Sequence, residues 1–221
     1  MEIKLLFPKI VGVNKLNTPN HLKKEIKKHY TNIDFDYTYK NTKDKVYRSH
    51  INVLSDYKYC EEFKQLLQKQ IDLYTNEVMK LKNKFIITTS WFTKTEKNAQ
   101  INYHRHANCM FSGVYYPEQK GEIANIVFND FQPQSSFVCN VNEWNGFNAD
   151  EYKVKPLSDL LILFPSSLYH KVEKNLYNTR YSLAFNCIPT GDIGIGDSFI
   201  RLNIWKIYFF YQDYQELVIL Y

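Results

Sequence analysis

The chain has 221 residues, of which 44% are hydrophobic, 23% charged and 16% aromatic. This composition is close to that of ordinary globular proteins and excludes a disordered, collagen-like or fibrous chain. A chain of this length can bury a sizeable core without disulfides, and it corresponds to one domain with room for an extension.

Positive charge is concentrated in the first part of the chain. The formal net charge is +5, and residues 1–97 carry 19 basic and 11 acidic side chains, against 9 and 12 in residues 98–221. A basic face there could bind nucleic acid or another anionic partner, and the alternative is a solvated, lysine-rich helix surface.

Cysteine spacing and hydropathy favour a reduced, cytoplasmic setting. The four cysteines, at positions 60, 109, 139 and 187, form no CxxC pair, and no signal-peptide pattern opens the chain. The most apolar segment, residues 204–221, contains three charged side chains, so we expect no membrane span. This tail could add a strand, a helix or a contact in a homodimer.

The first part of the chain predicts an extended segment followed by two helices. Residues 5–10 read as the extended segment, residues 21–30 have apolar side chains four positions apart, and residues 31–55 are polar and irregular. A long helix should follow, capped by Ser55 or Asp56, because apolar residues then recur every three or four positions. These positions are Cys60, Phe63, Leu67, Ile71, Tyr74, Val78 and Leu81.

From about residue 85 the sequence changes to the alternation and β-branched runs typical of strands. Six segments predict strands: 85–93, 100–106, 110–116, 124–129, 160–164 and 180–188. Many short strands after helical residues predict a mainly β, α+β fold, in which helices pack on one face of an antiparallel sandwich or barrel.

Three histidines could hold a metal ion. His104 and His106 are two residues apart in a predicted strand, so both side chains project from the same face. Two ordinary surface histidines are the alternative. His170, which follows the strand at 160–164 through a loop, is the third candidate.

Arg180 and Ser182 share one face of the last predicted strand. An arginine that projects from a core strand needs an anion, because burial of an unpaired charge is costly. A guanidinium group can bind a carboxylate through two parallel hydrogen bonds. The alternative is an internal ion pair with an acidic residue.

Taken in the order in which they occur along the chain, these histidine and arginine motifs resemble those of the Fe(II)/2-oxoglutarate-dependent dioxygenases. More narrowly, they resemble a family of 2OG-Fe(II) oxygenases common in phage and bacterial genomes. The resemblance extends from residue 5 to about residue 203. The matching segments are LFPKIVGVNKL (6–16), TSWF (89–92), HRHANCMFSGVYYP (104–117), LFPSSLYHKVEKN (163–175) and RYSLAFN (180–186).

The resemblance implies a double-stranded β-helix, or jelly-roll, core. Residues 1–203 would form a single oxygenase-like domain, with a helical lead-in at 1–84 and the jelly-roll core at 85–203. Gly113 would permit a close approach between strands.

The resemblance also implies a ligand set for Fe(II), with His104 and His170 as two of its members. His106 stands where this superfamily usually has a carboxylate. Either His106 is the third ligand, or Asp130 or Glu118 completes the site.

The same resemblance implies that Arg180 and Ser182 bind the cosubstrate 2-oxoglutarate. Arg180 would form a salt bridge with the distal carboxylate, Ser182 would add a hydrogen bond, and Tyr116 is a candidate third contact. Asn108 and Ser112 would orient a ligand histidine.

The implied function is an Fe(II)-, 2-oxoglutarate- and O2-dependent dioxygenase that hydroxylates a C–H bond and releases succinate and CO2. The substrate is unknown, with a protein side chain slightly preferred over nucleic acid or a small molecule. The loop from Phe131 to Pro156, which contains Trp144, could form the substrate wall. The alternatives are a three-histidine, cupin-like metal protein that does not use 2-oxoglutarate, and a catalytically silent binding module. If a phage encodes it, the protein would work in the host cytoplasm.

Overall fold

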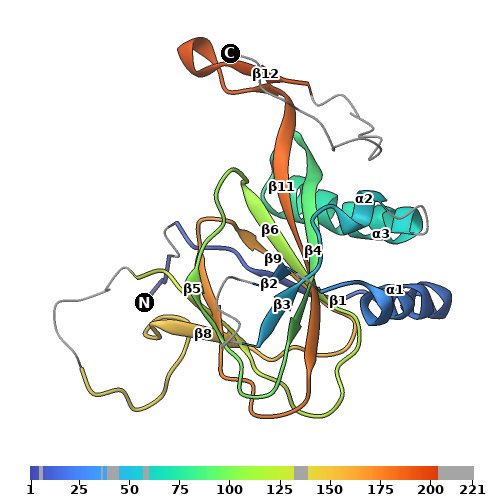
Figure 1. Ribbon diagram of the computed structural model, residues 1–221. Helices are drawn as coiled ribbons and strands as arrows, with labels where there is room; N and C mark the ends of the chain where they lie inside the picture. Colours follow the sequence, from blue (N-terminus) through green and yellow to red (C-terminus); the bar gives the residue numbers. More distant parts are fainter. Residues whose placement is uncertain (5–6, 36, 39–44, 57–59, 132–138, 204–221) are drawn as a thin grey trace, which may run out of the picture.

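A computed structural model describes residues 1–203 apart from 5–6, 36, 39–44, 57–59 and 132–138. Within these residues the protein is mostly β, with two antiparallel sheets and a few helices that lie on one side of the larger sheet (Figure 1). The predicted tail, residues 204–221, lies outside the described residues. None of the described helices has the length and apolar character needed to cross a membrane.

The helices precede most of the strands in the chain. They are α1 (Asn20–Asn32), α2 (Val53–Asp56) and α3 (Glu61–Asp72), and a π-helical turn (Leu73–Val78) follows α3 directly. The helix expected at 21–30 is confirmed as α1. Each of the two longer helices buries one apolar stripe, made of Leu22, Ile26 and Tyr30 in α1 and of Phe63, Leu67 and Ile71 in α3.

The single long helix expected after residue 55 is wrong in two respects. Ser55 lies inside α2, and α3 begins after Cys60 without a side-chain cap. The expected stripe is buried as far as Tyr74, but Val78 is 54% exposed. The backbone N–H of Met79 donates to the carbonyl of Tyr74 (3.1 Å), a π-type bond that widens the helix and rotates the residues within it.

The larger sheet has the strand order β1-β9-β6-β11-β4-β3-β2, and β12 pairs with β11. Every residue of β6 is buried, because this strand lies inside the sheet and both of its faces are covered. Such strands have continuous apolar sequences instead of alternating ones. The strands are β1 (Gly12–Lys15), β2 (Tyr37–Thr38), β3 (Val46–Arg48), β4 (Lys84–Thr95), β6 (Phe111–Tyr116), β9 (Leu160–Pro165), β11 (Arg180–Ile193) and β12 (Ile200–Leu202).

The smaller sheet has the order β5-β10-β7-β8 and faces the larger one. Its strands are β5 (Ile101–His104), β7 (Ile126–Asn129), β8 (Glu151–Val154) and β10 (Tyr169–Val172). One apolar cluster packs between the sheets: Val114, Tyr116, Ile126, Phe128, Val154, Leu160, Ile162, Phe164 and Leu168.

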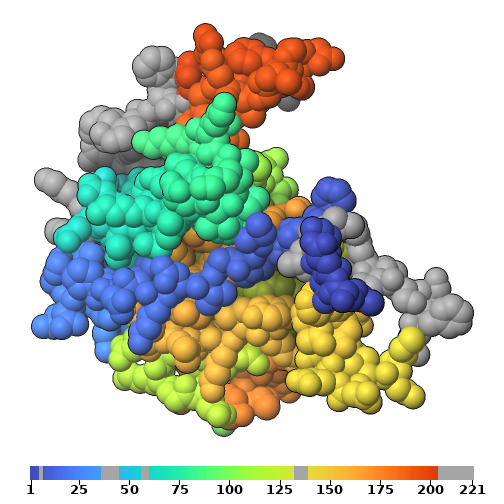
Figure 2. All heavy atoms as spheres, turned by 180° about the vertical axis from the view of Figure 1, so that it is seen from behind, coloured from blue at the N-terminus to red at the C-terminus, as the bar shows by residue number. Residues whose placement is uncertain are grey.

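A second apolar cluster lies between the helices and the opposite face of the larger sheet. Leu67 and Ile71 of α3 belong to it, together with Tyr115 and Phe185 of the sheet. Seen from behind, the N-terminal segment and the helices, coloured blue to teal, cover much of this face (Figure 2). The helices therefore stabilise one face of the larger sheet and leave the other to the smaller sheet.

All six predicted strands are present, as β4, β5, β6, β7, β9 and β11. The first strand is β1, which pairs with β9 and follows the segment expected at 5–10. His170 follows the loop as expected but lies on β10, a strand that was not predicted, and β5 ends at His104, short of the expected residue 106. The close approach expected at Gly113 is confirmed, since an added Cβ would lie 2.1 Å from Cζ of Phe185 on β11.

Candidate metal and cosubstrate site

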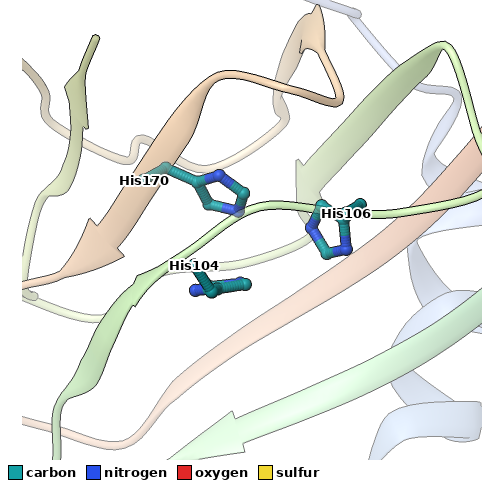
Figure 3. A group of neighbouring side chains, drawn as sticks. All are labelled: His104, His106 and His170. Atoms are coloured by element: carbon teal, nitrogen blue, oxygen red, sulfur yellow. The ribbon is translucent and has the colours of Figure 1, made fainter. Parts of the chain in front are cut away.

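The three candidate histidines meet between the two sheets (Figure 3). His104 ends β5 and pairs with His170 across the antiparallel β5–β10 ladder. His106 follows two residues beyond β5, where its backbone N–H donates to the carbonyl of Ser166 (3.0 Å). Each ring offers a ligand atom, and these atoms lie within 4.8 Å of one another. The group can therefore hold one metal ion.

Two of the rings are oriented by backbone carbonyls. Nδ1 of His104 lies 2.9 Å from the carbonyl of Asn102, and Nδ1 of His170 lies 3.1 Å from the carbonyl of Leu168. A carbonyl oxygen can only accept, so these contacts assign the proton to Nδ1 in both rings. The lone pair of each Nε2 atom is then available for a metal.

The environment keeps these histidines neutral. Burial, with a smaller contribution from the neighbouring histidines, lowers the pKa of His170 to about 3. Burial together with the charges of His104 and Arg48 lowers the pKa of His106 to about 4, and burial also lowers the pKa of His104. Neutral imidazole is the form that binds metal ions, so the site is preorganised for that role.

The donor set fits a transition-metal ion. Imidazole nitrogen suits iron, zinc, copper and nickel. Within the described ranges, no acidic side chain or cysteine joins the three histidines. Glu118 pairs with Lys27 (2.7 Å) and Asp130 lies 3.8 Å from Lys9. The expectation that one of these carboxylates completes the site is therefore not met.

Arg180 is buried in the wall of a cavity that the three histidines also line. It is 2% exposed, and its Nη2 donates to the phenol oxygen of Tyr116 (2.8 Å). Its Nε atom is buried without a hydrogen-bond partner in the part of the chain that the structure describes. The expected alternative, an internal ion pair with an acidic residue, is not found there. Such a guanidinium group is ready to bind an anion that enters the cavity.

The remaining cavity wall combines a few polar groups with an apolar surface. Ser182, 3% exposed, lines the cavity two residues from Arg180 on β11. Trp91 and Arg48 line it next to His106. The apolar part is formed by Ile101, Val114, Ile126, Phe164, Val172 and Ala184.

A family model matches residues 89–186, the segment that contains all three histidines, Tyr116, Arg180 and Ser182. The description of this family is "Putative 2OG-Fe(II) oxygenase". Residues 89–186 are therefore similar to a 2OG-Fe(II) oxygenase domain. A search of curated proteins found no match.

Solved structures of 2OG-Fe(II) oxygenases share the fold of this chain. A 2OG-Fe(II) oxygenase family oxidoreductase from Burkholderia pseudomallei superposes with a TM-score of 0.60 at 14% identity, covering 80% of this chain and 84% of its own. HygX from Streptomyces hygroscopicus, solved with nickel and 2-oxoglutarate bound, gives 0.57 at 12% identity, covering 82% and 84%. A prolyl-4-hydroxylase from Pseudomonas putida gives 0.52 at 15% identity, covering 80% and 92%.

The supporting groups of the candidate site differ from those expected. Asn108 is exposed in a turn with a φ of 57°, and carbonyls of the chain orient His104 and His170 instead. The Ser112 hydroxyl forms hydrogen bonds with the Ser166 hydroxyl (2.8 Å) and with the amide oxygen of Asn186 (2.9 Å). Ser112 therefore acts on the backbone position of Ser166, which holds His106, and not on a histidine ring.

Two side chains of the candidate site were not predicted from the sequence. Trp91 packs against the His106 ring, with ring centroids 5.8 Å apart, and Arg48 stands 5.4 Å from the Trp91 ring centroid. Trp91 lies in the TSWF segment, which was noted only for its resemblance. Arg48 is one of four arginines in a lysine-rich chain, and that rarity was the one available signal.

Proposed function

We propose that this protein is an Fe(II)- and 2-oxoglutarate-dependent dioxygenase that hydroxylates a C–H bond of its substrate and releases succinate and CO2. One observation carries the proposal: a buried arginine with no acidic partner among the described residues lines the same cavity as three neutral histidines. Metal-binding nitrogens and an anion-binding group in one cavity suit a metal ion together with a dicarboxylate.

His104, His106 and His170 would hold the iron. The contacts of the two Nδ1 atoms with carbonyls fix the rings of His104 and His170 and would leave their Nε2 atoms to bind the ion. Three neutral donors leave the positive charge of the ion uncompensated, whereas a carboxylate ligand would cancel part of it. An anionic cosubstrate is therefore favoured in this cavity.

Arg180, Ser182 and Tyr116 would hold the cosubstrate. The free N–H groups of Arg180 would bind the distal carboxylate of 2-oxoglutarate, and the Ser182 hydroxyl would donate a further hydrogen bond. Tyr116 would act mainly on Arg180, to which it is already hydrogen-bonded. When bound, iron and 2-oxoglutarate supply O2 activation coupled to decarboxylation of the keto acid.

The apolar walls of the cavity would protect this chemistry from water. Val114, Ile126 and Phe164 belong to the cluster packed between the sheets and also line the cavity. Excluding water strengthens the contacts of Arg180 and His170 with their ligands and prevents side reactions.

The proposal extends to the organisation of the chain. We expect residues 1–203 to work as one domain with a double-stranded β-helix core, which the two facing antiparallel sheets and the oxygenase folds covering about 80% of the chain support. A protein side chain remains the preferred substrate, and the loop from Phe131 to Pro156 the preferred substrate wall. Residues 132–138 of this loop lie outside the described residues.

The test is an anaerobic titration. Fe(II) and then 2-oxoglutarate are added to the purified protein, and the visible charge-transfer band of the chelate is followed. We expect a band in the wild type, its loss in His106→Ala, and a weaker affinity for 2-oxoglutarate, by about tenfold or more, in Arg180→Ala. The surface variants His21→Ala and Arg201→Ala serve as matched controls and should behave as the wild type does.

The second candidate function rests on the all-histidine donor set, which lacks the carboxylate of most related iron sites. A metal protein of this kind would bind iron without responding to 2-oxoglutarate. Metal uptake without a charge-transfer band would select it. Absence of metal uptake in anaerobic conditions would overturn both candidates and leave a binding module.

A further inference from the structure

The wall that β11 contributes to the cavity continues toward the protein surface. Arg180, Ser182 and Ala184 of this strand line the cavity. Side chains two residues apart in a strand project from the same face, so Asn186 is the next side chain on this wall. The first two of these four side chains are buried, whereas Ala184 and Asn186 are partly exposed. The wall therefore becomes more open in the direction of Asn186.

The neighbouring strand β4 opens in the same direction. Trp91 and Thr93 line the cavity, and Thr89 follows on the same face. Thr93 is 5% and Trp91 7% exposed, whereas Thr89 is only partly covered. Thr89 pairs directly with Asn186 in the β4–β11 ladder. The two strands run side by side and continue beyond the smaller sheet (Figure 1). Thr89 and Asn186 thus stand where the cavity wall reaches the surface.

These two residues lie at the His106 end of the site. Asn186 pairs with Ser112 of β6, and the Ser112 hydroxyl is hydrogen-bonded to that of Ser166 (2.8 Å). The carbonyl of Ser166 in turn accepts from the backbone N–H of His106 (3.0 Å). Arg180 lies at the far end of the wall, about 20 Å from Asn186 along β11. A molecule that enters past Asn186 would therefore meet the histidines before Arg180.

The direction of the hydrogen bonds in this row follows from which atoms carry protons. The amide oxygen of Asn186 can only accept, so the Ser112 hydroxyl donates to it (2.9 Å) and accepts its own bond from Ser166. The amide nitrogen of Asn186 can only donate, so the Thr89 hydroxyl oxygen accepts from it (3.1 Å). The bonds thus run in one direction, from the buried serines to Thr89.

Two hydrogen-bond donors are available at the outer end of this row. Within the described part of the chain, neither the hydroxyl proton of Thr89 nor the second N–H of Asn186 has an acceptor. Both groups are neutral, so the pair suits a neutral carbonyl oxygen, whose two lone pairs can accept both bonds. The next side chains toward the histidines, Ala184 and Trp91, are apolar and suit the hydrocarbon part of a ligand.

We propose that Thr89 and Asn186 bind a backbone carbonyl of a peptide substrate and so position the side chain that is hydroxylated. This inference rests on the proposed function and names the substrate class for the same site. The peptide would lie across the exposed end of the wall, and its side chain would pass Trp91 and Ala184 to reach the three histidines. The 2-oxoglutarate position at Arg180 would stay separate from it.

The experiment uses N-trifluoroethylacetamide as the probe and 19F relaxation as the readout. Its acetamide carbonyl represents the carbonyl of a peptide. Ethyl trifluoroethyl ether, which has the same chain of atoms without the carbonyl, is the matched control probe. The protein is loaded with Fe(II) under anaerobic conditions and saturated with 2-oxoglutarate. The paramagnetic contribution is obtained by comparison with protein loaded with Zn(II).

In the wild type the amide probe should relax about tenfold more than the ether, the effect expected of two neutral hydrogen bonds. Thr89→Val and Asn186→Ala should each reduce this ratio by about threefold, because each removes one donor. Thr89→Ser keeps the hydroxyl and should keep the ratio. Thr190→Val is the control, since the hydroxyl of Thr190 on β11 bonds to the carbonyl of Lys84 (3.0 Å).

Competition identifies the source of the carbonyl. N-acetylalanine methylamide, a single peptide unit, should displace the probe at a lower concentration than uridine or acetate does. Stronger displacement by uridine or by acetate would overturn the assignment to peptides, because a nucleobase or a carboxylate would then be the preferred ligand.

Equal relaxation by the amide and the ether in the wild type would overturn the inference, and this comparison needs no variant. An unchanged ratio in folded Thr89→Val and Asn186→Ala proteins would also overturn it, since the amide would then bind elsewhere near the metal. The charge-transfer band is recorded in the same samples. Its absence from the wild type would refute the proposed function instead, so that the two failures are distinguishable.

Discussion

The guanidinium group of Arg180 and the phenol of Tyr116 form one buried unit. Nη2 of Arg180 donates to Oη of Tyr116 at 2.8 Å, and the guanidinium carbon lies 4.9 Å from the centroid of the same ring. Burial raises the pKa of Tyr116 although the charge of Arg180 acts in the opposite direction. The phenol thus keeps its proton and fixes the direction in which the remaining N–H groups of Arg180 point.

Tyr116→Phe should therefore weaken 2-oxoglutarate binding without affecting the metal. Removing one hydrogen bond to a charged group costs about 2 kcal/mol, so we expect the dissociation constant for 2-oxoglutarate to rise about tenfold or more. The charge-transfer titration measures this constant, and the amount of bound iron is determined in the same samples. Tyr152→Phe, at a 60% exposed position, is the control. A change of less than about twofold in Tyr116→Phe would show that the phenol does not position Arg180.

Trp91 should control the affinity for the metal through His106. The His104 and His170 rings are hydrogen-bonded to carbonyls. The His106 ring instead packs against Trp91 of the larger sheet, with ring centroids 5.8 Å apart. Trp91→Ala should lower the affinity for Fe(II) by about tenfold, the lower end of effects seen for groups that orient ligands. Trp91→Phe should keep most of the affinity because a ring remains.

Trp144→Ala removes an indole that is 65% exposed and is the matched control for this series. Chelator competition gives the Fe(II) affinity of each variant. Equal affinities in Trp91→Ala and the wild type would show that backbone contacts alone hold His106.

The strands of the larger sheet could be predicted because their burial is written in the sequence. β6 and β9 are covered on both faces, and their sequences, FSGVYY and LLILFP, are almost uninterrupted apolar runs. The short strands β1, β8 and β12 could not be found in this way. They are three or four residues long, partly exposed, and depend on pairing with strands distant in sequence.

Only some of the side chains of the candidate site were predictable. The histidines and Arg180 carry their chemistry in their identity and spacing. The carbonyls of Asn102 and Leu168 belong to the backbone, and any residue could supply them. Arg48 reaches the cavity only because β3 pairs with β4, a contact that no local pattern indicates.

Gly113→Ala should destabilise the protein by overpacking. An added Cβ would lie 2.1 Å from Cζ of Phe185, and the ring is fully buried, so it has no room to move. We expect the free energy of unfolding to fall by about 2–3 kcal/mol. Gly146→Ala is the control, since nothing lies within 4 Å of its added Cβ. Urea unfolding gives both values. The double variant Gly113→Ala with Phe185→Leu should recover part of the loss, and no recovery would indicate a backbone cause instead.

Asp159 should make the stability depend on pH in the acidic range. Its carboxylate, 3% exposed, accepts hydrogen bonds from the backbone N–H and the hydroxyl of Thr18 and from the phenol of Tyr115, and it pairs with Lys23 (2.9 Å). Burial raises its pKa, but the hydrogen bonds from Thr18 and Lys23 outweigh this effect, so the pKa lies below its ordinary value. The carboxylate thus joins the segment before α1 to the strands β6 and β9.

The direction of this pH dependence follows from comparing proton binding by Asp159 in the folded and unfolded states. The unfolded chain takes up the proton at a pH of about 4, whereas the folded protein resists protonation until a lower pH. The stabilisation is therefore fully present above about pH 4 and is lost as the pH falls below that value. Asn at position 159 tolerates the observed φ of 69° but cannot become charged, so Asp159→Asn isolates the electrostatic part.

At pH 6, Asp159→Asn should lower the free energy of unfolding by about 2 kcal/mol, because hydrogen bonds to a buried charge are lost. At pH 3 the difference between the two proteins should shrink, since the wild-type carboxylate gives up part of its advantage. Urea unfolding at both pH values measures this, with Asp192→Asn, an exposed partner of Arg201, as the control. A difference that is equal at both pH values would mean that Asp159 stabilises the fold through its shape and neutral hydrogen bonds, because only the charged form loses its contribution on acidification.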